Sequence, residues 1–320
     1  ITWDSVPIRG VTVQDLRNDS FDIFREQAVL SRRMDKKDID ATNEQLLDSL
    51  NLLENGQLKR AAILLFHHNP EKWIPGAYVK IGYFESDSEL RYQDEIHGSL
   101  ISQANRVVDL IFTKYLKADI SYQGVTRVET YPFPKDAIRE AVFNAIAHKF
   151  YGALIPIQIS VYADKIYIAN DCIFPEDWTI DDLMGKHRSR PYNPLIANTF
   201  FRAGFIEAWG RGIEKIKDSC KEAGNPMPEY TIKHEDIMVM FKSLVSGTDQ
   251  GTNQANQGDD NSVSARILKV IQENPTLSQK KIADVIGEKY STVKYYMEAM
   301  KKSGVIKREG SSQKGKWVIL

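Results

Sequence analysis

The stretch that decides the fold of the central region reads REAVFNAIAH, from Arg139 to His148. Pro134 suits the first turn of a helix, and the apolar residues that follow at helical spacing extend this helix to about His148. Glu140, Asn144 and His148 recur at every fourth position, so they lie along one stripe of the helix. Asn is a poor helix former, so an Asn in the helix interior indicates a role for its side chain.

Two strands and two further helices are expected after this helix. Alternation of apolar and polar residues over 157–162 and 165–168 predicts two β-strands joined by a tight turn. Asn193-Pro194 is a cap and first-turn pair, and it opens a helix that Gly204 ends. Gly210-Arg211-Gly212 then opens another helix.

The run 139–148 resembles the N-box of the gyrase, heat-shock chaperone, histidine-kinase and MutL (GHKL) ATPases. The runs 193–197 and 204–213 look more narrowly like bacterial proteins labelled RecG-related helicases or transcriptional regulators. The likeness covers most of the chain, because 58–66 and the strand near 78–84 also fit it. It implies an α+β fold: a two-layer GHKL-like α/β sandwich, preceded by an α/β segment and followed by a winged helix-turn-helix. Members usually carry an upstream AlbA-like (Schlafen-type) domain, which we expect this chain to lack.

The resemblance implies a site for ATP and Mg²⁺. A side-chain amide supplies a hard oxygen ligand without adding charge, so Asn144 is the implied metal ligand. Glu140 is placed to orient or deprotonate a water for attack on the γ-phosphate, which makes it the implied catalytic residue. Glycines ahead of a helix let backbone N–H groups approach phosphate. The residues implied to bind the nucleotide are Asn144, His148, Asp171, Gly210 and Gly212.

The turn after the second strand departs from the pattern of these ATPases. They carry an Asp followed by spaced glycines, and the related branch an Asn-Pro-Gly-Gly-type turn, whereas Asn170 to Pro175 contains no glycine. Asp171 can still accept a hydrogen bond from an adenine amino group, but its neighbours can fill the pocket. Phe150 also stands where the branch usually has an acid. We therefore expect a degenerate ATP-binding domain, with a weakly active Mg-ATPase as the alternative.

Two strings that look like helicase motifs are interpreted as chance matches. Asp94-Glu95-Ile96-His97 matches a DExH string but lacks the apolar strand that would deliver its acids to a metal. Gly310 to Lys316 has the spacing of a phosphate-binding loop, but Trp317 follows where Ser or Thr must hold the metal. Helicase motor activity is therefore not expected.

The charge of the chain is divided unevenly. Residues 263–320 contain twelve Lys and Arg against five acids, although the whole chain has a net charge of −1. The remainder is therefore acidic, and the asymmetry indicates a polyanionic partner for the basic end. Between them, 246–262 lacks aromatic and large aliphatic residues, so we expect a flexible linker.

The basic end reads as three short helices and a hairpin. The first helix is expected over 264–272, and Ser278 and Ser291 are expected to cap the second and third. Ile282, Val285 and Ile286 are placed on one apolar face of the second helix, and Val293, Met297 and Met300 are placed in the core. A hairpin over 305–320 completes a pattern that resembles a winged helix-turn-helix domain. The residues expected to contact DNA are Ser291, Thr292, Lys294, Tyr295, Lys301, Lys302, Lys307, Arg308, Lys314 and Lys316.

The sequence thus predicts an N-terminal α/β segment (1–120), a GHKL ATPase-like domain (121–245), a linker (246–262) and a winged helix (263–320). The leading hypothesis is a cytosolic transcriptional regulator that binds double-stranded DNA, as a homodimer if its operator is palindromic. An active ATPase coupled to DNA and a protein-interaction scaffold are the alternatives. No apolar run is long enough for a membrane helix, so no membrane partner is expected. Two cysteines are too few for a disulfide framework.

Overall fold

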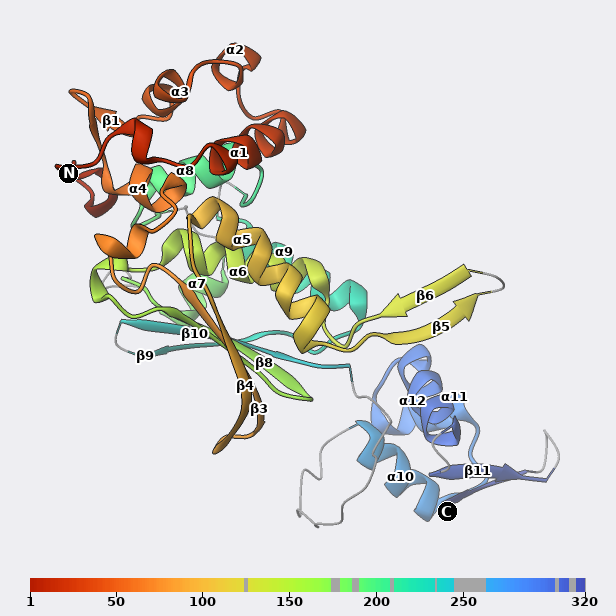
Figure 1. The fold of residues 1–320 in the computed structure, drawn as a ribbon. Coiled ribbons are helices and arrows are strands. Elements are labelled where there is room, and N and C mark those ends of the chain that lie inside the picture. Colours follow the sequence, from red (N-terminus) through yellow and green to blue (C-terminus); the bar gives the residue numbers. More distant parts are fainter. Residues whose placement is uncertain are drawn as a thin grey trace. The chain divides into compact units, whose positions relative to one another are not determined.

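A computed structural model describes residues 1–123, 126–173, 179–185, 190–207, 210–233, 235–244, 263–302, 305–310 and 315–319. The chain divides into two compact units, Ile1–Leu244 and Val245–Leu320 (Figure 1). The expected linker over 246–262 and the expected DNA contact Lys314 lie outside the described residues. No helix within the described ranges is long and apolar enough to cross a membrane.

The first unit mixes helices and strands along its whole length. Its described helices are α1 (Asn18–Ser31), α2 (Lys36–Ile39), α3 (Asn43–Ser49), α4 (Arg60–Phe66), α5 (Leu100–Leu110), α6 (Lys135–His148), α7 (Ile180–Met184), α8 (Pro194–Arg202) and α9 (Gly212–Ala223). Its described strands are β1 (Leu53–Glu54), β2 (Gln57–Leu58), β3 (Val79–Ser86), β4 (Glu89–Ile96), β5 (Asp119–Gln123), β6 (Thr126–Thr130), β7 (Ile157–Val161), β8 (Lys165–Asp171), β9 (Glu229–Lys233) and β10 (Asp236–Lys242). A π-helical turn, Ile111–Tyr115, continues α5.

The centre of this unit is a six-stranded mixed sheet in the order β4-β3-β7-β8-β10-β9. Strands β3 and β7 pair in parallel, with Ile81 opposite Ile159, and the other neighbours are antiparallel. Because β3 and β4 precede residue 120, the sheet extends across the boundary expected there between two domains. The predicted α+β fold class is confirmed.

Helices cover one face of this sheet, which makes the two-layer arrangement visible in Figure 1. The pleat sends alternate side chains to that face, so Ile166 and Ile168 on β8 are buried there. The predicted helix over 135–148 is confirmed as α6, and its Phe143 ring packs against the rings of Phe200 and Phe205. The helix layer and the sheet therefore share one apolar core.

The start of α8 is held by a residue from the far end of the chain. Asp4 is fully buried, and its Oδ2 accepts hydrogen bonds from Leu195 N at 2.7 Å and Ile196 N at 3.2 Å. Asn193, the expected cap, instead donates its side-chain amide to Ala147 O and Lys149 O at the end of α6. A helix cap of this kind contributes about 1 kcal/mol. The predicted boundary is right, but a distant carboxylate makes the cap.

The second unit forms the expected three helices and hairpin. Its described elements are α10 (Val263–Glu273), α11 (Gln279–Ile286), α12 (Tyr290–Lys302), β11 (Ile306–Glu309) and β12 (Lys316–Ile319). Ser278 caps α11 by accepting from Lys281 N, as predicted. The predicted core positions Val293, Met297 and Met300 are buried.

Two expectations for this unit are wrong. Val285 is 63% exposed, because the buried stripe of the short helix α11 is narrower than its apolar pattern suggested. Helix α12 begins at Tyr290, so Ser291 lies in the first turn and does not cap it. The first hydrogen bond of this helix runs from Val293 N to Lys289 O, which places the cap at Lys289.

Candidate functional site

A cavity of about 160 Å³ lies between α6, α9 and strands β8 and β10. Its base is apolar, with Ile168, Ile216 and Val239 among the lining residues. Its polar lining residues come from α6, β8, β9, the segment before α8 and the segment between α8 and α9. They are Asn144, His148, Asn170, Arg190, Tyr192, Glu207 and Tyr230. An apolar cavity with a few convergent polar groups is the usual form of a small-molecule site.

Four of the residues expected to bind a nucleotide line this cavity, and Glu140 lies next to it. Asn144, His148, Gly210 and Gly212 are lining residues. The Nδ2 of Asn144 donates a long hydrogen bond of 3.4 Å to Oε1 of Glu140, one helical turn away. The structure therefore brings the predicted stripe of α6 and the two glycines together.

Gly212 has a packing reason to be glycine. A Cβ atom at this position would lie 2.7 Å from Nδ2 of Asn144 and 3.1 Å from Oε1 of Glu140. A side chain at this position would have to displace the ends of these two side chains, so glycine lets the first turn of α9 lie close to the polar stripe of α6. Gly210 has a φ of 67°, a left-handed conformation that favours glycine.

The carboxyl group of Glu140 is buried away from solvent. Its side chain is 1% exposed, and Oε2 forms an ion pair of 3.0 Å with Nζ of Lys215 on α9. Burial raises the pKa of Glu140 above its usual value, and the hydrogen bond and charge of Lys215 oppose that rise. Lys215 also lies 3.9 Å from Glu207, so one ammonium group serves two carboxylates.

The predicted adenine contact Asp171 is not among the residues that line the cavity. Its neighbours Asn170 and Cys172 are buried and do line it. Alternate residues of a strand point to opposite faces, so Asp171 faces away from the helix layer. The sequence does contain a signal for the inward residue. Ile166 and Ile168 are buried, and the same alternation along the strand continues to Asn170.

The side chains that stand in place of the glycines of these ATPases lie at the cavity, as expected from the sequence. Cys172 and Ile173 both line the cavity, whereas 174–178 lie outside the described residues. Burial raises the pKa of the Cys172 thiol to about 12, so this thiol is protonated at neutral pH. Phe150 packs edge-to-face on Tyr192, a lining residue, with ring centroids 5.3 Å apart. The side chains of Cys172 and Ile173 therefore fill space in the cavity wall that glycines would leave open.

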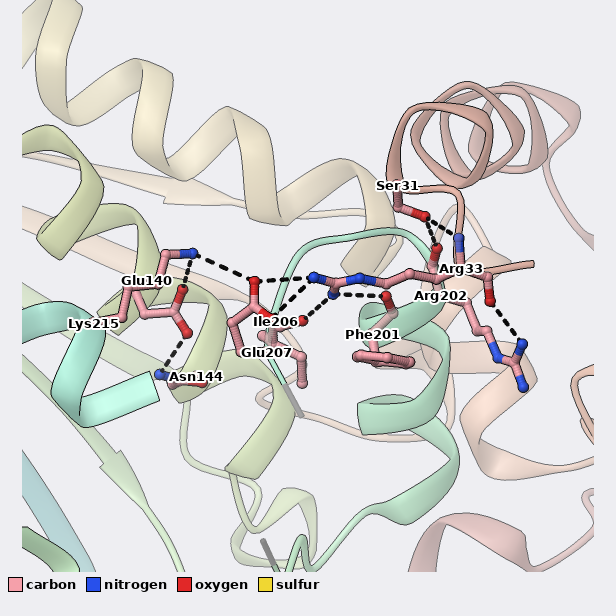
Figure 2. Close-up of polar contacts among 9 residues, drawn as sticks. All are labelled: Ser31, Arg33, Glu140, Asn144, Phe201, Arg202, Ile206, Glu207 and Lys215. Carbon is pink, nitrogen blue, oxygen red and sulfur yellow. Dashed lines mark hydrogen bonds and ion pairs between the residues drawn. The ribbon is translucent and has the colours of Figure 1, made fainter. Parts of the chain in front are cut away.

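Sequence reasoning missed Glu207 and Lys215, which Figure 2 places beside Glu140. Both belong to the region around the start of α9, and neither stands in the helical stripe that drew attention to Glu140. No pattern within the sequence links the three side chains. Among the described residues, no group of three His, Cys, Asp or Glu side chains could hold a metal ion.

The second unit presents lysines on α12 and on its hairpin. Lys294, Lys301, Lys307 and Lys316 are exposed, and Lys307 pairs with Glu309 at 2.7 Å. Arg308 is half-buried, with its guanidinium 4.9 Å from the centre of the Trp317 ring. Of the other expected DNA contacts, Thr292 is half-buried, and the side chains of Ser291, Tyr295 and Lys302 lie outside the described part of the chain.

Trp317 fixes the hairpin against the helices of this unit. Its ring nitrogen donates to Leu277 O at 3.0 Å, and its backbone N–H donates to Pro275 O at 2.7 Å. The tryptophan is also buried in the core of the unit. The exposed lysines of β11 and β12 are therefore carried on a hairpin that is packed against the helices.

Two family models match parts of the chain. Residues 155–241 match the model described as "Putative ATP-dependent DNA helicase recG C-terminal". Residues 261–307 match the model described as "Winged helix-turn-helix DNA-binding". The chain carries a RecG C-terminal ATPase-like domain and a winged helix. The first match begins after α6, so Glu140, Asn144 and His148 precede it.

The chain is also similar to a solved structure, the DIP2311 protein from Corynebacterium diphtheriae. The TM-score is 0.62 at 16% identity, over 99% of this chain and 64% of that one. At this identity the likeness concerns the fold alone, and this chain spans only 64% of the length of that protein. A search of curated proteins found no match.

Proposed function

We propose that this protein is a transcriptional regulator that binds double-stranded DNA through its winged helix. The observation that carries the proposal is the set of exposed lysines on α12 and the hairpin of a matched winged helix. In such domains the third helix enters the major groove with its N-terminal residues nearest the bases. Thr292 and Lys294 are in that position, while Lys301, Lys307 and Lys316 neutralise phosphates.

Duplex affinity should fall steeply with salt and depend on the second unit. We expect fluorescence anisotropy with labelled duplex DNA to show binding by the full chain, because each neutralised phosphate releases counterions. A variant that ends at Leu244 keeps the whole first compact unit and should lose this binding. Equal binding by the truncated variant would place the DNA contacts elsewhere and contradict the proposal.

The cavity of the ATPase-like unit is proposed to bind a nucleotide with Mg²⁺. The apolar base suits a purine ring, and Asn170 offers a polar contact at its edge. Because Nδ2 of Asn144 faces Glu140, the Oδ1 atom of the same amide remains as a hard oxygen for the cation. Bound Mg²⁺ would neutralise phosphate charge, while the residues of α6 and α9 bind and orient the nucleotide.

Slow or absent turnover is proposed for this site. A general base must reach the attacking water within hydrogen-bond distance, and Glu140 is closed off by Lys215, Asn144 and the start of α9. Cys172 and Ile173 also occupy wall positions where these ATPases have glycines. Nucleotide binding would therefore act as a signal to the regulator rather than as a source of work.

The nucleotide proposal predicts a specific effect of Asn144→Ala. Isothermal titration with MgATP should show binding to the wild type and at least about tenfold weaker binding to the variant, because a metal ligand is lost. Asn274→Ala, an exposed Asn in the second unit, is the matched control and should bind like the wild type. Absence of MgATP binding to the wild type would eliminate the proposed nucleotide site.

A working Mg-ATPase coupled to DNA is the second candidate function. The placement of Glu140 and Asn144 one turn apart beside the cavity favours it. Phosphate release that is lost in Glu140→Ala would distinguish it from nucleotide sensing. Binding to a palindromic operator would further imply a homodimer.

A further inference from the structure

The face of the six-stranded sheet that points away from the helices of the first unit is called the outer face (Figure 1). Ile168 on β8 and Val239 on β10 point toward the helices and are buried, so the residues on either side of each point to the outer face. These outward residues form four cross-strand pairs, which are called the paired row. The pairs are Lys165 with Lys242, Tyr167 with Met240, Ala169 with Met238, and Asp171 with Asp236.

The two ends of the paired row carry opposite charge. Lys165 lies directly opposite Lys242 at one end, and Asp171 lies directly opposite Asp236 at the other. The two ends are separated by residues 165 to 171 of β8, which is about 20 Å. Like charges at directly opposed positions destabilise an antiparallel pair. Partial burial and the negative charge of Asp171 raise the pKa of Asp236, as expected for such a repulsion.

The middle of the paired row is apolar and partly open to solvent. Tyr167, Met238 and Met240 are half-buried. The Tyr167 ring meets the ring of Tyr162 edge-on, with centroids 5.9 Å apart, and Tyr162 stacks on Phe84 at 5.4 Å. The apolar surface therefore continues from β8 and β10 toward β7 and β3. An apolar centre between charged ends is the usual composition of a protein–protein interface.

Each of the four charged side chains also has an interaction within the chain. These are Glu229 for Lys242 at 2.7 Å, the rings of Tyr162 and Tyr167 for Lys165 at 4.7 and 5.7 Å, Lys233 opposite Asp236, and the charge of Lys149 near Asp171. The side chains of Lys242 and Glu229 are 49% and 58% exposed, so water screens this ion pair. Contacts of this strength leave the ends of the row available to a partner with matching charge.

The partner that matches this pattern is the same surface of a second copy. A twofold axis between β8 and β10, perpendicular to both strands, reverses the row and places its positive end over the negative end of the other copy. Lys165 then lies over Asp236 of the second copy. The outward residues of β7, which are Gln158 and Ser160, carry no charge and would lie over β9 of the second copy.

The apolar middle also matches itself under this axis. Tyr167 would lie over Met238 of the second copy, and Met240 over its Ala169. A large side chain thus meets a small or flexible one, and methionine adapts its shape to the space available. Two sheets that pack face to face in this way form an ordinary β-sandwich.

We propose that the outer face is a homodimer interface, in which the paired row of one copy lies antiparallel on the paired row of a second copy. The proposal deepens the proposed regulator, because it rests on the homodimer that a palindromic operator would require and gives that dimer its surface. The opposed charges select the antiparallel arrangement, since a parallel arrangement would place like charges together.

Two complementary charge reversals test this interface in the full chain without DNA. Lys165→Glu/Lys242→Glu makes both ends of the row acidic, and Asp171→Lys/Asp236→Lys makes both ends basic. Sedimentation velocity over a concentration series should show a wild-type dimer and at least about tenfold weaker self-association of each variant. An equimolar mixture of the two variants should sediment as a dimer again, because acidic ends then meet basic ends.

The mixture separates lost complementarity from a damaged fold. Circular dichroism checks that each variant is folded, and Lys165→Glu and Asp236→Lys as single changes replace any double variant that is not. Lys36→Glu/Lys37→Glu, on exposed residues of α2, is the matched control and should dimerise like the wild type. A monomeric wild type, dimers that persist in both reversals, or a mixture that stays monomeric would each overturn the proposal.

Single-stranded nucleic acid is the other class of partner that the test must reject. Tyr162 and Tyr167 beside Lys165 would suit stacked bases, but Asp171 and Asp236 repel a phosphate backbone. Fluorescence anisotropy with labelled oligo-dT should show no binding that depends on Tyr167. Binding that is lost in Tyr167→Ala would assign the outer face to nucleic acid and contradict the dimer.

Duplex binding, measured separately, distinguishes failure of this proposal from failure of the proposed regulator. A dimer with the expected charge dependence but without duplex binding would support the interface and reject the regulator. Duplex binding by a chain that is monomeric throughout would support DNA recognition and reject the interface.

Discussion

Replacement of Lys294, Lys301 and Lys316 together by alanine should weaken duplex DNA binding by about a hundredfold at low salt. All three are exposed on α12 or the hairpin, so their ammonium groups can reach phosphates. The plot of log affinity against log salt has a negative slope, and each lost phosphate contact should make this slope shallower by about 0.9. Fluorescence anisotropy over a salt series measures both quantities on the full chain.

A charge-matched control separates local contacts from the overall field of the molecule. Lys36, Lys37 and Lys233 are exposed in the first unit, and their replacement by alanine removes the same charge. We expect this triple variant to keep nearly the wild-type affinity and salt slope. An equal loss in both triple variants would show that net charge alone attracts DNA, and the winged-helix interface would be wrong.

Lys215→Met should destabilise the first unit by about 2 kcal/mol at neutral pH, because it leaves the buried carboxylate of Glu140 without its cation. Loss of the lysine from a fully buried ion pair would destabilise the protein more. Because the side chain of Lys215 is 42% exposed, water can partly take the place of its ammonium group beside Glu140. Urea denaturation gives this free energy of unfolding. Lys221→Met, an exposed lysine on the same helix, is the control and should change stability little.

The loss should depend on pH in a defined direction. Burial raises the pKa of Glu140 in the folded protein. The wild type therefore already loses stability as pH rises from the ordinary pKa of a glutamate to this raised pKa. Without Lys215 the folded pKa rises further. The difference between variant and wild type should therefore be small in acid, grow through the raised pKa of the wild type and level off above that of the variant. The double variant Glu140→Gln/Lys215→Met should recover stability at neutral pH, and a loss independent of pH would contradict the role of Glu140.

Most of the helices and strands could be predicted because their signals are local. The period of the apolar residues and the flanking Pro and Gly identified α6, α8, α9 and the strands β7 and β8. In the second unit the same signals identified Val293, Met297 and Met300 as core. The errors at Val285 and Ser291 concern a short helix and a helix end, where a shift of one residue changes which side chains are buried.

The candidate site was predictable only in part. Glu140, Asn144 and His148 share one helix, so their common stripe follows from spacing alone. Asp171 was predicted from the resemblance, which implies an Asp after the second strand, whereas the alternation of the strand points Asn170 to the cavity. The side of a strand that a residue occupies is set by register, and a one-residue difference moves it to the opposite face.

By itself the sequence determined the order of elements, the division into an acidic body and a basic winged helix, and the polar stripe beside the cavity. Only the tertiary structure decided that Asp4 caps α8 and that Glu207 and Lys215 lie beside Glu140. The reason is physical: periodicity and turn chemistry act between neighbours along the chain, whereas ion pairs and long-range caps join residues that meet only when the core has packed. Such pairs leave no regular spacing in the sequence, so their partners are known only from the fold.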